Sequence, residues 1–145
     1  MNAQEFSERL WDFAVRVAKV VDALPETRVG RHVAGQLVRC GTSSAPNYEE
    51  ACSAESKADF AHKIGVATKE MRETRGWLRF IVKLEMHAAS KMNPLTRESE
   101  ELLKMLASSF ATAKGRPRSQ PIQLRGSDPI TNSKSPVPST QFRRP

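Results

Sequence analysis

The sequence predicts an all-α protein, an antiparallel up-down four-helix bundle with a disordered C-terminal tail. Four segments carry apolar residues at the three- and four-residue spacing of an amphipathic helix. No segment shows the strict alternation of apolar and polar residues that is typical of a half-buried strand. The links between the four segments are short, which favours antiparallel neighbours. The predicted bundle covers residues 1–114, and the predicted tail covers residues 115–145.

The first predicted helix carries an apolar stripe that runs from Phe6 to Leu24 with steps of three and four residues. It ends before Pro25, because a residue that precedes proline avoids the α region. Thr27 can accept a hydrogen bond from the next backbone turn, and it is therefore the predicted N-cap of a second helix that begins at Arg28.

The second predicted helix is interrupted near its middle. Small residues crowd the stretch 41–45, and Pro46 lacks a backbone donor and clashes with the preceding turn. Two outcomes stay open on this basis. The helix either kinks at residues 42–45, or it stops and a short helix restarts near Asn47.

The third predicted helix begins after Ser56, a suitable N-cap with Asp59 in the acidic first turn, and it runs to about His87. Its apolar residues keep a heptad rhythm over three heptads. The pair Asn93 and Pro94 predicts the start of the fourth helix, because proline suits the first helical position. A basic last turn and a glycine at position 115 end this helix.

The last turns of the third predicted helix are apolar over roughly 240°, which is wider than one bundle core needs. A second subunit would bury the excess, and this interpretation predicts a homo-oligomer. Alternatively, the fourth helix and the turn before it cover these residues within one chain. The predicted oligomer interface comprises Trp77, Phe80, Ile81 and Leu84.

Polar residues accompany the apolar row of the third predicted helix. Glu70 and Glu73 continue that row, and Lys63 and Lys69 are candidate donors to them. The row is either a solvated helix face, or a partly buried network that fixes helix register or a subunit joint, or a catalytic group. An unpaired buried charge is very unfavourable, so the second interpretation requires pairing. The predicted network comprises Arg39, Asn47, Glu50, Glu70 and Glu73.

No catalytic or metal-binding motif stands out in the chain. The three histidines have no ligand spacing to cysteine or acid, and Glu-x-x-His, Gly-x-Ser-x-Gly, phosphate-binding glycine loops and Cys-x-x-Cys are absent. We therefore predict no cofactor, no metal and no enzymatic activity. One enzymatic alternative remains, a helical-bundle ribonuclease that uses Arg28 and His32.

The two cysteines and the N-terminus indicate the compartment. Cys40 and Cys52 lie twelve positions apart on one predicted helical stretch, which is ~18 Å and too far for a disulfide. We expect free, reduced thiols. The first residues lack the features of a signal peptide, and no apolar run approaches the ~18 residues of a membrane span. A cytoplasmic protein without membrane contact is expected.

The net charge of +7 is concentrated in the predicted tail. Residues 115–145 contain six basic residues against Asp128, whereas residues 1–114 contain 17 basic and 15 acidic residues. The tail is either a solubilising terminus or a segment that attracts RNA or another polyanion. The predicted nucleic-acid contacts are Arg28, Arg31, Arg116, Arg118, Arg125, Arg143 and Arg144.

Three blocks are distinctive as a set: QLVRCGTSSAPNYEEAC at residues 36–52, SKADFAHKIGVA at residues 56–67, and KEMRETRGWL at residues 69–78. With these blocks the chain resembles the bacterial four-helix-bundle family of ribosomal-RNA intervening-sequence proteins, over roughly residues 6–113. Pro46 departs from the family pattern. The family is similar to the accessory protein of diversity-generating retroelements, which forms a homopentamer and engages nucleic acid and a reverse transcriptase.

The resemblance implies a homopentamer without enzymatic activity. The retroelement relative is strongly basic in its body, whereas the predicted bundle of this chain is nearly neutral. We therefore expect a non-enzymatic, oligomeric helical scaffold that accompanies RNA or DNA, with a reverse transcriptase or another protein as a further partner. The alternative within binding proteins is an adaptor for a protein partner that does not contact nucleic acid.

Overall fold

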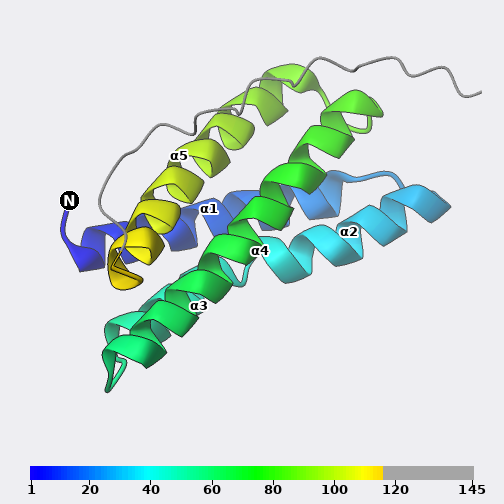
Figure 1. Ribbon diagram of the computed structural model, residues 1–145. Helices are drawn as coiled ribbons and strands as arrows, with labels where there is room; N and C mark the ends of the chain where they lie inside the picture. Colours follow the sequence, from blue (N-terminus) through cyan, green and yellow to red (C-terminus); the bar gives the residue numbers. More distant parts are fainter. Residues whose placement is uncertain (116–145) are drawn as a thin grey trace, which may run out of the picture.

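The computed structural model describes residues 1–115, which form one antiparallel bundle of four arms (Figure 1). Its helices are α1 (Ala3–Ala23), α2 (Arg28–Gly41), α3 (Ser44–Cys52), α4 (Lys57–Lys83) and α5 (Ala89–Ala113). The helices α2 and α3 follow each other along one arm, and both α1 and α4 pack against α2, α3 and α5. Within the described part of the chain there is no strand. The predicted all-α four-helix bundle is confirmed, and the predicted tail from residue 116 onward lies outside the described residues.

The core lies between the four arms and is formed by one apolar stripe from each. Phe13 of α1, Leu37 of α2, Met71 of α4 and Leu106 of α5 each have 1% or less of their surface exposed. Burying a side chain of this size stabilises the folded state by about 1.5–3 kcal/mol. The heptad rhythm in the sequence therefore marks the stripes that hold the arms together.

Side-chain caps fix the helix starts that the sequence predicts. Thr27 Oγ1 accepts a hydrogen bond from the Gly30 amide at 3.0 Å. Ser56 Oγ accepts one from the Asp59 amide at 3.1 Å. Each cap satisfies a backbone donor that has no partner inside its helix. The predicted starts of α2 and α4 are confirmed.

Gly30 lies where the chain turns from α1 into α2, and no larger residue fits there. A Cβ atom at this position would lie 1.8 Å from the Pro25 carbonyl oxygen and 3.0 Å from Thr27 Oγ1. Both neighbours belong to the turn that caps α2. By contrast, a Cβ atom on Gly35, in the middle of α2, would meet no atom within 4 Å.

The second arm stops and restarts, as one of the two alternatives predicts. The helix α2 ends at Gly41, and α3 begins at Ser44 rather than near Asn47. Pro46 lies in the first turn of α3, where backbone amides have no intrahelical acceptor and a missing N–H costs little. The break thus falls just before the proline, and it places the small residues at the packing surface.

The helix α4 ends at Lys83, so the prediction that it reaches about His87 is wrong. The Glu85 amide donates to the Val82 carbonyl at 3.1 Å, and the Met86 amide donates to the Ile81 carbonyl at 3.0 Å. Glu85 itself has a left-handed backbone with φ of 56°. This is the Schellman arrangement, which usually has glycine at the left-handed position. A glutamate there gives no sequence signal for a helix end.

The helix α5 begins at Ala89, so the prediction that it starts at Asn93 and Pro94 is also wrong. The amides of Lys91 and Met92 donate to the Ala88 carbonyl at 3.0 and 3.1 Å, which closes a turn before the proline. Met92 is completely buried. Its burial anchors this turn, and Pro94 is close enough to the helix start to be accommodated.

An ion pair fastens α1 to α5. Arg9 Nε lies 2.6 Å from Glu98 Oε1, and Arg9 Nη2 donates to Glu98 Oε2 at 2.9 Å. The two side chains are 33% and 21% exposed. These two hydrogen bonds lower the pKa of the Glu98 carboxyl, whereas its partial burial opposes the shift. The pair therefore adds stability wherever Glu98 is ionised.

Candidate functional site

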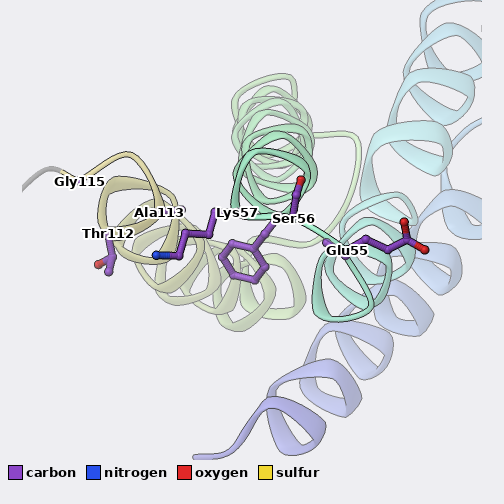
Figure 2. A pocket seen from close by; sticks show the side chains of 8 residues that line it. Glu55, Ser56, Lys57, Thr112, Ala113 and Gly115 are labelled. Atoms are coloured by element: carbon purple, nitrogen blue, oxygen red, sulfur yellow. The ribbon is translucent and has the colours of Figure 1, made fainter.

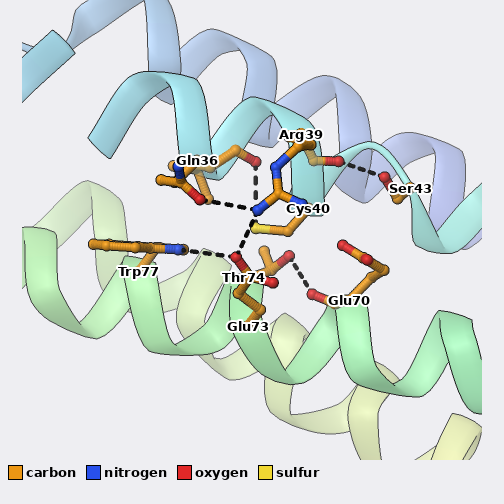
Figure 3. A network of polar contacts seen from close by, with 9 residues as sticks. Gln36, Arg39, Cys40, Ser43, Glu70, Glu73, Thr74 and Trp77 are labelled. Carbon is orange, nitrogen blue, oxygen red and sulfur yellow. Dashed lines mark hydrogen bonds and ion pairs between the residues drawn. The ribbon is translucent and has the colours of Figure 1, made fainter. Parts of the chain in front are cut away.

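The face shared by α2 and α4 carries a charged contact that the sequence predicts. Arg39 Nη2 lies 3.1 Å from Glu73 Oε1 and 2.9 Å from Gln36 Oε1 (Figure 3). Trp77 Nε1 approaches the same Glu73 oxygen at 3.5 Å. Because Arg39 is 59% and Glu73 39% exposed, solvent screens this pair, and it contributes at most about 1 kcal/mol.

Glu70 lies one turn before Glu73 and differs from it. Its Oε2 atom is buried and has no hydrogen-bond partner within the described residues. Its backbone carbonyl accepts a hydrogen bond from Thr74 Oγ1 at 2.7 Å. Figure 3 shows the Glu70 side chain pointing toward the second arm, at the level of Ser43. Glu70 was predicted as a member of the network, but its carboxylate pairs with none of the other members.

The other two residues of the predicted network make contacts of their own. Asn47 Nδ2 donates to the Ser43 carbonyl at 2.8 Å, within the start of α3. Glu50 Oε2 lies 2.5 Å from Lys63 Nζ, across the contact of α3 and α4. Arg39 and Glu73 form one pair, Glu50 and Asn47 bond to residues outside the predicted set, and the Glu70 carboxylate pairs with none of the other four, so the structure does not join the five into one network.

The Cys40 thiol lies beside this face and is completely buried. Burial raises its pKa, and a side-chain hydrogen bond with Thr74 opposes this shift only in part. A thiol held in the protonated state is a poor nucleophile. Cys40 is therefore a core residue rather than a reactive group, and neither cysteine forms a disulfide.

Apolar and aromatic side chains continue the face shared by α2 and α4, toward the start of α2 and the end of α4. The His32 and Trp77 rings meet edge to face with centroids 5.9 Å apart, and the Trp77 and Phe80 rings do so at 5.6 Å. Phe80 is 40% and Leu84 51% exposed. We call His32, Trp77, Phe80 and Leu84 the aromatic patch.

The structure corrects one residue of the predicted oligomer interface. Ile81 is completely buried in the core of its own chain, so it is not available to a second subunit. Ile81 keeps the heptad spacing of Met71 and Leu78, which are also completely buried, whereas Phe80 lies off this row. Trp77, Phe80 and Leu84 remain at the surface.

A groove between α4 and α5 was not predicted from the sequence. Its volume is about 450 Å³, and α4 contributes most of its lining, including His62, Lys69 and Arg72. Phe110 of α5 and Lys114, the residue that follows α5, lie on its other side. Among residues 1–115, no carboxylate lines this groove. The spacing of His62, Lys69 and Arg72, by seven and then three residues, is the sequence signal that could have placed them on one face. We call this feature the α4–α5 groove.

A second hollow, of about 640 Å³, lies at the end of the bundle where α3 leads into α4 and α5 ends. Figure 2 shows Lys57 pointing from α4 toward Thr112 and Ala113, whereas Glu55 points away from them. Glu55 and Lys57 are the ionisable side chains among the described residues that line this hollow. Because they point apart, they do not form the adjacent pair of nucleophile and base that covalent catalysis requires.

The predicted nucleic-acid contacts are divided between described and undescribed residues. Arg28 and Arg31 are exposed in the first turn of α2, and Arg31 Nη1 donates to the Glu26 carbonyl at 2.7 Å. His32, the partner of Arg28 in the ribonuclease alternative, packs its ring against Trp77. Five further predicted contacts lie outside the described residues: Arg116, Arg118, Arg125, Arg143 and Arg144.

The described residues hold neither a cluster of metal ligands nor a helix that could span a membrane. Within residues 1–115, no three side chains of His, Cys, Asp or Glu come together as metal ligands. None of the five described helices combines the length and the hydropathy that crossing a bilayer requires.

Comparisons with known proteins agree with the fold. The family described as 23S rRNA-intervening sequence protein matches residues 4–108. A crystal structure from Bacteroides thetaiotaomicron VPI-5482, of a protein with unknown function from the S23 ribosomal protein family, is 30% identical. The match covers 76% of this chain and 98% of that one, with a TM-score of 0.69. A search of curated proteins gives no match.

Proposed function

The chain belongs to the 23S rRNA-intervening sequence protein family, and on this premise we propose that it is a non-enzymatic, homo-oligomeric scaffold that associates with RNA. The observation that carries the proposal is the aromatic patch. A face with a half-buried tryptophan and with Phe80 and Leu84 about half exposed is typical of a surface that another protein covers.

A second copy of the chain is the partner that we propose for this patch. Aromatic side chains are enriched in the centre of interfaces, where each can contribute more than 1 kcal/mol. The exposed pair of Arg39 and Glu73 borders the patch and would form a polar rim. The resemblance to the retroelement accessory protein makes a pentamer the expected state.

The association with RNA rests on charge. The predicted tail, residues 115–145, carries +5, whereas the remaining chain carries +2. Positive charge attracts nucleic acid without a specific fold, because binding releases condensed counterions. We propose no catalytic role for the bundle.

Light scattering coupled to size-exclusion chromatography tests the assembly. We expect a mass that is a small multiple of the 16.2 kDa chain, five-fold for a pentamer. Phe80→Glu and Leu84→Glu should reduce this mass, because each places a charge in the proposed contact. Val15→Glu is the matched control, since Val15 is 53% exposed on α1, outside the patch. A wild-type monomer at micromolar concentration would refute the oligomer, and dissociation by the control alone would move the interface to α1.

Fluorescence anisotropy with single-stranded RNA over a salt series tests the second half of the proposal. If the tail supplies most of the affinity, its six basic side chains limit the log–log salt slope to roughly −4 per chain. Deleting residues 115–145 should flatten this slope and leave the helical content unchanged. Absence of binding at low salt would favour the adaptor for a protein partner. Cleavage of the RNA by the wild type but not by His32→Ala would instead indicate the ribonuclease.

A further inference from the structure

The α4–α5 groove has an unusual distribution of charge for a bundle that is nearly neutral. All of its ionisable lining residues are potential cations: His62, Lys69 and Arg72 on α4, and Lys114 directly after α5. All four side chains are exposed. None of them takes part in an ion pair within residues 1–115. The groove therefore presents uncompensated positive charge to the solvent.

The charge of the predicted tail, residues 115–145 of the same chain, argues against the tail as the occupant of the groove. The predicted tail follows directly on Lys114 and carries +5. Like charges repel, so the tail is not a complementary partner for a groove lined by cations. A polyanion is complementary to both, and it could engage the groove and the tail in succession.

The floor of the groove is apolar and includes an aromatic ring. Gly65 leaves room for Phe110, because a Cβ atom on Gly65 would lie 2.9 Å from Phe110 Cε2. The Phe110 ring is half-buried, and Lys114 Nζ lies 5.9 Å from its centroid, over the face of the ring. Basic side chains beside an aromatic ring are the elements that bind single-stranded nucleic acid, whose unpaired bases can stack on such rings.

We propose that the α4–α5 groove binds single-stranded RNA, with Lys69, Arg72 and Lys114 on the phosphates and Phe110 against a base. This inference rests on the proposed association with RNA and adds a binding surface on the folded bundle. The groove and the aromatic patch share no residue, so separate substitutions can test RNA binding and self-association.

The test is fluorescence anisotropy of the full-length protein with a labelled oligouridylate about 12 nucleotides long. Lys69→Gln combined with Arg72→Gln removes two cations from the groove. On a single strand at ~0.1 M salt, each lost phosphate contact weakens binding about five-fold, so this double variant should bind about 25-fold more weakly. Its salt slope should fall by about 1.4.

The matched control is Arg16→Gln combined with Lys19→Gln, which removes the same charge from exposed positions on α1. This control should change the affinity much less. Phe110→Leu keeps an apolar side chain over Gly65 and should weaken binding at least about five-fold. Circular dichroism melts of all variants report whether the bundle is folded.

The outcomes separate this inference from the proposed function. RNA binding that the groove variants leave unchanged, or that the α1 control weakens equally, would overturn the groove and leave the association with RNA standing. Unchanged affinity in Phe110→Leu would overturn the base contact. Absence of binding by the wild type at low salt would overturn both the groove and the proposed association.

Discussion

Replacing Gly30 by alanine should destabilise the bundle, although alanine is the better helix former. The added carbon would lie 1.8 Å from the Pro25 carbonyl oxygen, and this backbone atom cannot rotate away. The turn before α2 must move, which endangers the hydrogen bond from the Gly30 amide to Thr27 Oγ1. Overpacking of this kind costs about 1–3 kcal/mol, and a lost cap costs about 1 kcal/mol.

The helix propensity of alanine offsets part of this cost. Alanine in a helix interior is about 0.5–1 kcal/mol more favourable than glycine. The net loss for Gly30→Ala is therefore about 1–3 kcal/mol. Gly35→Ala, on the same helix, should instead gain about 0.5–1 kcal/mol, because a Cβ atom there meets nothing within 4 Å.

Urea denaturation followed by circular dichroism measures both variants against the wild type. All three proteins must be compared at one concentration, because self-association would stabilise the folded state by mass action. A Gly30→Ala protein as stable as the wild type, or an equal change in both variants, would refute the close approach of Pro25 to α2.

Three other substitutions follow from the helix ends and the ion pairs. Glu85→Gly should raise the free energy of unfolding by about 0.5–1 kcal/mol in denaturant melts, because glycine adopts the φ of 56° without steric cost; lower stability would contradict this. Glu98→Gln should lose about 1–2 kcal/mol at neutral pH. Arg9 lowers the pKa of Glu98 in the folded state, so the stability that the ion pair adds is present above the unfolded pKa of about 4.3 and is lost as the pH falls. The stabilities of wild type and Glu98→Gln, measured by melts from pH ~6 to ~3, should therefore converge. A stability difference that does not change with pH would contradict this linkage. Glu73→Ala should change stability by no more than ~1 kcal/mol in a thermal melt, since its pair with Arg39 is solvated, and a loss of 3–5 kcal/mol would indicate a buried network instead.

The starts of α2 and α4 could be predicted from the sequence because capping is local. Thr27 and Ser56 bond to amides only three residues away, so the residue types alone identify them. The end of α4 and the start of α5 were missed, because no residue type signals them. Glu85 adopts a left-handed backbone that its side chain does not signal, and buried Met92 extends α5 ahead of Pro94.

The candidate site was predicted only where one helix carries it. Trp77, Phe80 and Leu84 follow one another along α4, and the sequence identifies them as excess apolar surface. Ile81 was wrongly assigned to the same surface, although it keeps the heptad spacing of the buried residues Met71 and Leu78. The α4–α5 groove needs Phe110 beside Gly65, and no pattern within α4 shows which residue of α5 lies opposite.

The contrast between the two cysteines gives the protein a built-in probe of its own opening. Cys52 is exposed and Cys40 is completely buried, and both are free thiols. An alkylating reagent should modify Cys52 at the rate of an open thiol and Cys40 only when the contact between the second arm and α4 separates. The ratio of the two labelling rates then gives the free energy of that opening, with each molecule serving as its own reference. Measured with and without RNA, the ratio would report how strongly RNA in the α4–α5 groove stabilises the closed bundle.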